Sequence, residues 1–242
     1  MPPLEKYGRS LDYTYAPGLF PTLEALNKRP EQVQRVLISS GLTDKDGLRQ
    51  IETLCQRHGI RTETADKALA RISGKDNCYA AAVVKKQGYS LVSDSRHLVL
   101  HHPSDKGNLG TILRSALGFG FLDIAVITPA ADLYDPHVVR ASMGAMFSLN
   151  VQEFDTFEAY RALYPKHTLY PFMLDGSKTL KEAAKSVVYP YALIMGNEGS
   201  GLPASFQREG VPVRIAHSDA IDSLNLSIAA SIGMYAFMQA EE

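Results

Sequence analysis

The chain has 242 residues, 45% of them hydrophobic and 21% charged, which is the size and composition of a soluble globular protein with one large or two modest domains. It has no run of eighteen apolar residues and no signal-peptide core near Met1, so we expect no membrane partner and a cytoplasmic location. Its formal net charge of −1 by itself argues against a nucleic-acid partner. Cys55 and Cys78 show no metal-site or redox spacing, so we expect two reduced thiols and no metal.

Residues 1–85 are predicted to form a small alternating α/β domain. The opening, through Pro17-Gly18, is rich in turn residues and is expected to be a poorly ordered lead-in. Apolar spacing then predicts alternating helices and strands. In chain order these are a helix from Leu19, a strand over 33–39, a helix around 51–55, a strand over 60–64, a helix over 65–72 and a strand over 79–84.

Charge is divided unevenly along the chain. Residues 1–90 hold 14 Lys and Arg against 10 Asp and Glu, a net charge of +4, whereas the remainder carries −5. This asymmetry arises by chance or marks separate tasks for the two parts. If RNA is the partner, the first part is the expected landing surface for its phosphates. Residues 86–95 are polar and interrupted by Gly88, and they are predicted to be a linker.

Residues 96–242 are predicted to form a second domain in which strands and helices alternate more clearly. Repeated βα units favour a mostly parallel sheet with helices on both faces. The expected strands are 98–101, 124–128, 149–154, 169–174, 192–195 and 213–216, and the expected helices are 109–117, 138–147, 157–163, 179–184, 204–209 and 224–240. Because the last helix is apolar most of the way round, we expect it to be buried by the sheet on one side. Its other side faces a second subunit or a neighbouring helix.

Two stretches of this second part carry residues suited to chemistry. The helix from Asn108, its expected N-cap, buries Ile112 and Leu113 and places Arg114 on another face. The planar guanidinium suits a phosphate or a developing negative charge, although this segment alone favours an ordinary solvated helix arginine. After the apolar run 192–195, three glycines surround Glu198, which predicts either a ligand crevice at a strand end or a surface turn.

A third stretch, residues 211–230, is a strand that runs into a polar turn and a helix. Ser223 and Asn225 are good N-cap residues there. Together, the three stretches resemble the SpoU/TrmH-type RNA ribose 2′-O-methyltransferases of the SPOUT superfamily. The matching sequence motifs are Asn108-x-Gly-x-Ile-x-Arg114, then Ile-Met-Gly-Asn-Glu-Gly-x-Gly-Leu and then Asp-Ser-Leu-Asn-Leu-Ser, with a small-residue segment at 140–147. Each stretch alone is weakly specific, whereas three in register over about 120 residues are specific.

The resemblance implies a trefoil knot near the C-terminus, S-adenosylmethionine bound in that knot, no metal and a homodimer. Cofactor contacts would come from the main chain of four residues and from three further residues. These are Leu174, Gly196, Ile215 and Leu224, and then Asn197, Gly199 and Ser223. The residues carried over as catalytic are Asn108, Arg114, Glu198, Ser223 and Asn225.

The chain departs from the family's pattern in two places. The family has Ile-Pro-Met and then a glycine where this chain has Ile215-Ala-His217 and Asp219. Backbone contacts survive such changes, so the side chains of His217 and Asp219 are the ones able to alter cofactor affinity. Residues 1–85 resemble more loosely the small α/β substrate-binding domain that precedes many such catalytic domains. There Asn77-Cys78-Tyr79 replaces a His-Gln-Gly run, which puts the usual RNA contacts in doubt.

The implied reaction is attack of a ribose 2′-oxygen on a sulfonium methyl group. Alignment can supply ~7–11 kcal/mol, more than the roughly 3–5 kcal/mol of a general base, so positioning should dominate. A charged guanidinium has no acceptor, and we therefore expect Arg114 to clamp a phosphate and stabilise the alkoxide while a substrate phosphate or water takes the proton. Asn108 would hold the substrate or Arg114, Glu198 would anchor the loop or the ribose, and Ser223 and Asn225 would complete the pocket.

The predicted substrate is ribosomal RNA, favoured over transfer RNA by the separate N-terminal domain. Methylation of a base nitrogen is an alternative within enzymes, and a non-catalytic RNA-binding or assembly factor with the same fold is an alternative outside them. A dinucleotide-binding oxidoreductase is disfavoured because no GxGxxG follows an early strand.

Overall fold

The structure is a computed structural model that describes residues 4–73 and 78–240. Contacts between Cα atoms divide the chain into two compact units. The first holds residues up to Gln87 together with Asp132–Ser148, and the second holds Gly88–Ala131 and the chain from Leu149 onward. The sequence prediction assigned residues 132–148 to the second domain, whereas the structure packs them with the first unit. No helix in the described part of the chain is long and apolar enough to cross a membrane.

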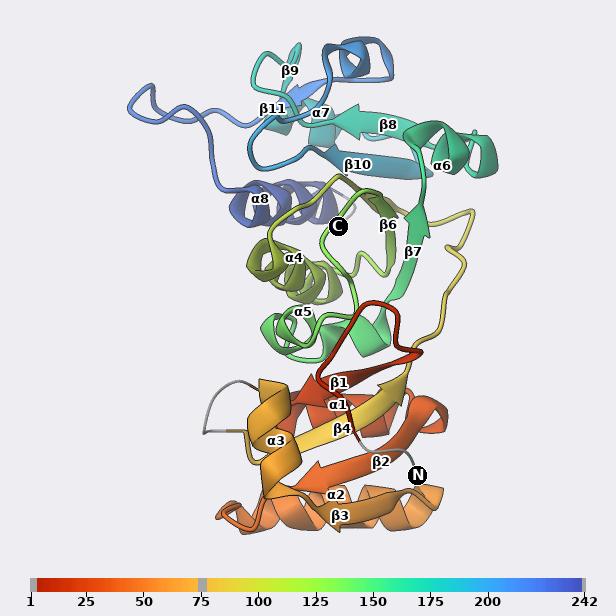
Figure 1. The fold of residues 1–242 in the computed structure, drawn as a ribbon. Coiled ribbons are helices and arrows are strands. Elements are labelled where there is room, and N and C mark those ends of the chain that lie inside the picture. The colour runs from red at the N-terminus through yellow and green to blue at the C-terminus, as the bar shows by residue number, and fades with distance from the viewer. Residues whose placement is uncertain (1–3, 74–77, 241–242) are drawn as a thin grey trace. The chain divides into compact units, whose positions relative to one another are not determined.

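A four-stranded sheet of order β1-β4-β2-β3 forms the centre of the first unit (Figure 1). Strand β4 pairs antiparallel with β1 and β2, and β2 pairs parallel with β3. The side chains of Tyr15, Leu37 and Val83 pack with Leu69 in one buried cluster. The elements of this part are β1 (Tyr13–Pro17), α1 (Leu19–Lys28), η1 (Pro30–Gln32), β2 (Val33–Ile38), α2 (Lys45–His58), β3 (Arg61–Thr64), α3 (Asp66–Ser73) and β4 (Ala80–Lys85).

Strand β1 corrects the prediction of a poorly ordered lead-in. Thr14, Tyr15 and Ala16 are fully buried, because β1 pairs with β4 and is packed against by the later segment 132–148. The Thr14 hydroxyl donates to the carbonyl of Tyr134, and the Tyr7 hydroxyl donates to Asp132 at 2.5 Å. The partners that make this a strand are therefore distant in sequence, and local turn chemistry did not reveal them.

The predicted helix over 138–147 is broken in the structure. Helix α5 (Pro136–Ala141) ends early, and the 3-10 helix η2 (Ala145–Ser148) follows. Between them Met143 and Gly144 have left-handed φ values of 54° and 81°. A Cβ at position 144 would lie 2.7 Å from the Cβ of Glu24, so the turn depends on glycine for space as well as for φ.

The second unit contains a five-stranded sheet of order β7-β6-β5-β10-β8, in which every neighbouring pair is parallel. This confirms the predicted α/β architecture with a mostly parallel sheet. Helices α4 and α8 contact each other on one side of the sheet, and α6 lies on the other (Figure 1). The strands are β5 (His97–His101), β6 (Asp123–Ile127), β7 (Asn150–Phe154), β8 (Thr168–Pro171), β9 (Lys178–Thr179), β10 (Tyr191–Met195) and β11 (Val213–Arg214). The helices are α4 (Lys106–Gly118), α6 (Phe157–Leu163), α7 (Leu180–Lys185), the 3-10 helix η3 (Ala204–Arg208) and α8 (Leu226–Gln239).

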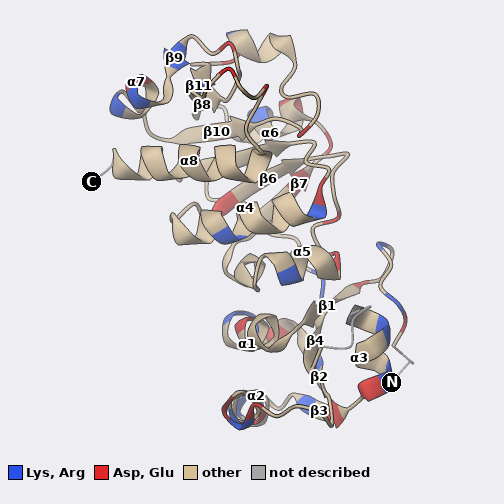
Figure 2. Ribbon diagram, turned by 90° about the vertical axis from the view of Figure 1, so that its left-hand side faces the viewer, with Lys and Arg blue, Asp and Glu red and all other residues tan. Residues whose placement is uncertain are grey.

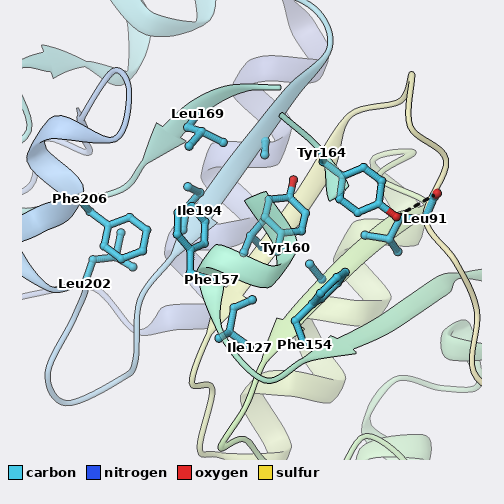
Figure 3. Close-up of a cluster of buried hydrophobic side chains, with 13 residues drawn as sticks. Leu91, Ile127, Phe154, Phe157, Tyr160, Tyr164, Leu169, Ile194, Leu202 and Phe206 are labelled. Atoms are coloured by element: carbon cyan, nitrogen blue, oxygen red, sulfur yellow. Dashed lines mark hydrogen bonds between the residues drawn. The ribbon is translucent and has the colours of Figure 1, made fainter. Parts of the chain in front are cut away.

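The core on the α6 side is rich in aromatic rings (Figure 3). Tyr160 is fully buried, and its ring lies edge-on to Phe154 with centroids 5.5 Å apart. Ile194 of β10 and Leu202 belong to the same cluster, so the core fixes both ends of the glycine-rich stretch between them. Rigid ends allow that stretch to keep one shape without regular secondary structure of its own.

Helix α8 carries no charged residue, and Figure 2 shows it without any Lys, Arg, Asp or Glu along its length. Met234 and Phe237 are fully buried, as the prediction for this helix required. Gly233 permits the close approach, because a Cβ there would lie 2.7 Å from the Phe172 ring. In contrast, Ile228 and Tyr235 are each 51% exposed, which leaves an apolar strip on the opposite side.

Two buried histidines stack at the base of the sheet. His97 is fully buried, with its Nε2 at 2.8 Å from the Val92 carbonyl and its Nδ1 at 3.0 Å from the Tyr160 hydroxyl. A carbonyl only accepts, so Nε2 carries the proton and Nδ1 accepts from Tyr160. The His167 ring stacks on His97 with centroids 4.1 Å apart. Burial lowers the pKa of His97 to about 4 and also lowers the pKa of His167.

We expect this cluster to make the fold sensitive to mild acid. The unfolded state takes up a proton on His97 near its ordinary pKa of about 6.5, whereas the folded state resists until about pH 4. The contribution of neutral His97 to the free energy of unfolding is therefore fully present above about pH 6.5. It falls by about 3 kcal/mol as the pH drops towards 4. Urea unfolding measured at several pH values in this range gives the free energy of unfolding as a function of pH. For His97→Gln this free energy should depend less on pH than it does for the wild type. This assignment would be contradicted if His97→Gln and the wild type showed the same pH dependence. It would also be contradicted if His58→Gln, on the exposed surface of α2, reduced the pH dependence as much as His97→Gln does.

Candidate active site

A cavity of about 320 Å³ lies at the carboxyl ends of β8 and β10. Three stretches line it, namely residues 172–175, residues 195–202 and positions between 213 and 229. Phe172 and Met195 contribute apolar surface, whereas Asp175 and His217 contribute polar groups. A cavity of this size at the carboxyl edge of a parallel sheet has the volume and place of a small-ligand site.

All seven residues predicted to contact a cofactor line this one cavity. They are Leu174, Gly196, Asn197, Gly199, Ile215, Ser223 and Leu224. Within the predicted catalytic set, Glu198 and Ser223 line it as well, whereas Asn108, Arg114 and Asn225 do not. Of the departures from the family pattern, His217 lines the cavity and Asp219 does not.

The glycine-rich stretch is a tight loop closed by its own backbone. Asn197 and Gly201 exchange two hydrogen bonds, of 3.2 and 3.0 Å. The Asn197 side-chain oxygen accepts from the backbone of Gly199 at 2.9 Å and of Ser200 at 3.1 Å, and its Nδ2 donates to the carbonyl of His102 at 2.8 Å. Asn197 therefore shapes the loop from inside and joins it to the end of β5.

Glu198 holds the loop against the start of α4. One carboxylate oxygen accepts from the Ser104 N–H at 3.0 Å and the Ser104 hydroxyl at 2.8 Å. The other accepts from the Asp105 N–H at 3.1 Å and from Asn108 Nδ2 at 3.3 Å. Burial alone would raise the pKa of Glu198, but these hydrogen bonds outweigh it and lower that pKa. Asn197 Nδ2 also lies 3.4 Å from the first oxygen. An ionised carboxylate with this many donors is suited to anchoring and not to taking up a proton.

Asn108 and Asn225 meet across the site. Asn225 is the N-cap of α8 and accepts from the Ser227 N–H at 2.9 Å, which confirms it as a cap residue. Its Nδ2 donates to the Asn108 side-chain oxygen at 3.0 Å. Asn108 was predicted to cap α4, and this was wrong, because Asp105 is the cap and accepts from the Asn108 N–H at 2.7 Å. The cap lies three residues earlier, so Asn108 sits inside the first turn with its side chain free to join Glu198 and Asn225.

Arg114 lies two turns further along α4 and is exposed. Its neighbours Ile112 and Leu113 are fully buried, as predicted. Among the described residues, no carboxylate pairs with Arg114. Its charge is therefore available to an external ligand, although the side chain does not line the cavity.

Sequence reasoning did not single out Ser104 or His102. Ser104 supplies two of the donors to Glu198, and His102 supplies the carbonyl that orients Asn197. His102 has a left-handed φ of 57°, which is uncommon outside glycine and marks a constrained position. Ser104-Asp105 just before an apolar helix is a typical helix-start pattern, and that pattern is the signal that could have identified Ser104.

Comparisons with known proteins agree with the three motifs. The model of the SpoU rRNA Methylase family matches residues 95–235. "Ribosomal RNA small subunit methyltransferase G 2" of Syntrophobacter fumaroxidans is 28% identical over 135 residues, 55% of this chain and 25% of that protein. "23S rRNA (uridine(2479)-2′-O)-methyltransferase" of Streptomyces viridochromogenes is 31% identical over 149 residues, 57% of this chain and 50% of that protein. The matches thus span half or less of the length of these two curated relatives.

The fold is also found among solved structures. The crystal structure of the SpoU methyltransferase AviRb from Streptomyces viridochromogenes, in complex with the cofactor AdoMet, superimposes with a TM-score of 0.79 at 23% identity. That match covers 95% of this chain and 91% of the other. The family model covers more than half of the sequence, and the likeness of fold extends over nearly all of it. The chain therefore belongs to the SpoU rRNA methylase family.

Proposed function

We propose that this chain is an S-adenosylmethionine-dependent methyltransferase that modifies a ribose 2′-hydroxyl of ribosomal RNA. The observation that carries the proposal is the junction of the cavity with the Glu198–Asn108–Asn225 hydrogen-bonded cluster, which joins the three family motifs in one place. The 2′-O-methyltransferase relative acting on 23S rRNA and the AdoMet complex of the similar structure support the reaction and the cofactor.

The cavity fits the cofactor by size and by chemistry. Its apolar surface, from Phe172 and Met195 among others, suits an adenine ring, and the backbone of the 196–202 loop offers hydrogen-bonding groups. Asp175 and the ionised Glu198 give the lining a negative character that suits a cationic ligand. We propose that the seven lining residues predicted from the family motifs hold it.

When bound, S-adenosylmethionine supplies a sulfonium methyl group that a ribose 2′-oxygen attacks, giving a methyl ether, S-adenosylhomocysteine and a proton. The residues of this chain act mainly by positioning, which can contribute ~7–11 kcal/mol. Arg114 clamps a substrate phosphate and stabilises negative charge on the attacking oxygen. Glu198 stays ionised and fixes the loop, and the proton passes to a substrate phosphate or to water. Asn108, Ser223 and Asn225 complete the wall on the substrate side.

The proposal includes a trefoil knot and a homodimer. Two glycines support the knot by allowing backbones to cross in direct contact. A Cβ on Gly176 would lie 2.5 Å from the Val213 carbonyl carbon, and one on Gly210 would lie 2.2 Å from the Leu169 oxygen. The uncharged strip of α8 with exposed Ile228 and Tyr235 supports a second copy as its cover. We further propose that the positive charge of the first 90 residues attracts RNA phosphates.

The test is transfer of labelled methyl groups from S-adenosylmethionine to RNA from cells that lack this protein, followed by alkaline digestion. Because a 2′-O-methyl group blocks alkaline cleavage, we expect the label in alkali-resistant dinucleotides derived from ribosomal RNA. Label in alkali-sensitive nucleotides would instead assign base methylation. No label in any fraction, precursor ribosomal particles included, would overturn the enzymatic proposal and favour an RNA-binding role.

A further inference from the structure

We infer that Asn225, Asn108 and Glu198 form a hydrogen-bond relay with a single direction, in which the cap of α8 sets the orientation of the Asn108 amide. The inference rests on the proposed function for its link to catalysis. It assigns Asn225 a positioning task beyond capping, and it adds Ser104 to the residues that position the site.

The orientation of the relay is set first at Asn225, the N-cap of α8. The Asn225 side-chain oxygen accepts from the Ser227 N–H at 2.9 Å, the Ser227 hydroxyl at 2.7 Å and the Ile228 N–H at 3.4 Å. With its oxygen committed to three donors, Asn225 can present only its Nδ2 to Asn108, 3.0 Å away. Asn108 must therefore accept this hydrogen bond with its side-chain oxygen.

The direction ends at Glu198. Once the Asn108 oxygen faces Asn225, its Nδ2 faces the Glu198 carboxylate, and that contact is 3.3 Å. A carboxylate is an acceptor only, so this is the one orientation that satisfies both neighbours. Ser104 keeps the carboxylate in place with its N–H and its hydroxyl. The backbone of Asn108 is fixed separately, because its N–H donates to the cap residue Asp105 at 2.7 Å.

The relay and the cap can be separated by one substitution. Asp is as good an N-cap as Asn and interacts well with the positive end of a helix, so Asn225→Asp retains the cap. It places a carboxylate oxygen against the Asn108 oxygen, however. If the Asn108 amide flips, its oxygen then meets the Glu198 carboxylate. No orientation of Asn108 satisfies both ends. Asn225→Ser keeps a cap oxygen, introduces no carboxylate and removes the amide Nδ2 that contacts Asn108.

We therefore expect Asn225→Asp to lower kcat for RNA methylation by about 10²-fold, because a displaced group near the reacting atoms costs about that much. Asn225→Ser should lose less, and both variants should keep the wild-type melting temperature and affinity for S-adenosylmethionine within a few fold. Thr156→Asp, at the cap of α6, is the matched control for a new cap carboxylate and should behave as wild type. If Asn225 only caps the helix, Asn225→Asp will equal or exceed the activity of Asn225→Ser, which would overturn the inference.

A second measurement, hydrogen exchange of side-chain amides, tests the hydrogen bonds of the relay independently of catalysis. In the ligand-free protein, the side-chain amide protons of Asn108, which contact Glu198 in a partly buried place, should exchange with water more slowly than those of an exposed asparagine. Asn225→Asp should accelerate that exchange. Unchanged exchange at Asn108 in this variant would reject the relay. If the wild-type protein methylates no RNA, the proposed function fails, and this measurement still decides whether the relay exists.

Discussion

Arg114→Ala should lower methyl transfer by about 10²–10³-fold, the range found when a single group that stabilises a developing oxyanion is removed. Arg114 is exposed on α4, does not line the cavity and pairs with no carboxylate in the described part of the chain. Its loss should therefore leave the binding of S-adenosylmethionine within a few fold. Calorimetric titration with the cofactor, alongside single-turnover transfer to RNA, measures the two quantities separately.

The choice of controls decides what an Arg114 effect means. Arg114→Lys keeps the charge and loses the planar fork, so partial activity would indicate that charge matters and geometry refines it. Arg208→Ala removes an exposed arginine that lies outside the first 90 residues and does not line the cavity, and it should leave turnover unchanged. Equal losses of turnover and of cofactor affinity in Arg114→Ala would contradict the clamp role and place Arg114 in the structure of the cavity.

Gly196→Ala should weaken cofactor binding strongly. A Cβ at this position would lie 2.4 Å from the carbonyl carbon of Gly201 and 2.5 Å from the nitrogen of Leu202, and both are backbone atoms that cannot rotate away. The loop must open, at a cost of about 2–3 kcal/mol, which corresponds to about 30–150-fold in affinity if the strain falls on the bound state. Equilibrium binding of the cofactor measures the strain in the bound state, and thermal unfolding of the ligand-free protein measures the strain in the free state.

Gly199→Ala is the matched control in the same loop. Its Cβ would meet only the Asn197 side-chain oxygen, at 3.6 Å, which is an ordinary contact. The Gly199 N–H that donates to Asn197 is retained. Gly199 lines the cavity, so the added methyl group can touch the cofactor and weaken binding by a few fold, but binding should remain far tighter than in Gly196→Ala. A loss as large as that of Gly196→Ala would show that the loop responds to any side chain, and the argument from close backbone approach would be wrong.

The sequence predicted the parts of the site that depend on local patterns. The apolar run before Gly196 is a strand, the buried face of α4 holds Ile112 and Leu113, and Asn225 caps the last helix. Each follows from periodicity, glycine chemistry or a cap preference, which act over a few residues. The family assignment followed from the order of three such patterns and is confirmed by the family model.

The partners of these residues could not be predicted in the same way. Glu198 binds the start of α4 more than 90 residues earlier in the chain, and Asn108 meets Asn225 across 117 positions. Strand β1 was missed for the same reason, because β4 and residues 132–148 cover it. Pairings of this kind are decided by topology, on which one sequence carries no direct signal.

The first unit is discontinuous in sequence, and this has a consequence for its biogenesis. Tyr7 and Thr14 bind Asp132 and Tyr134, and α5 packs on β1. Chain synthesis proceeds from the N-terminus at about 5–20 residues per second, so the emerging first 87 residues must wait several seconds for the segment that completes them. A fragment cut at the linker would lack that cover over β1, and a fragment starting at Gly88 would carry α5 without its partner. Fragments for isolated study should therefore graft residues 132–148 onto the N-terminal piece.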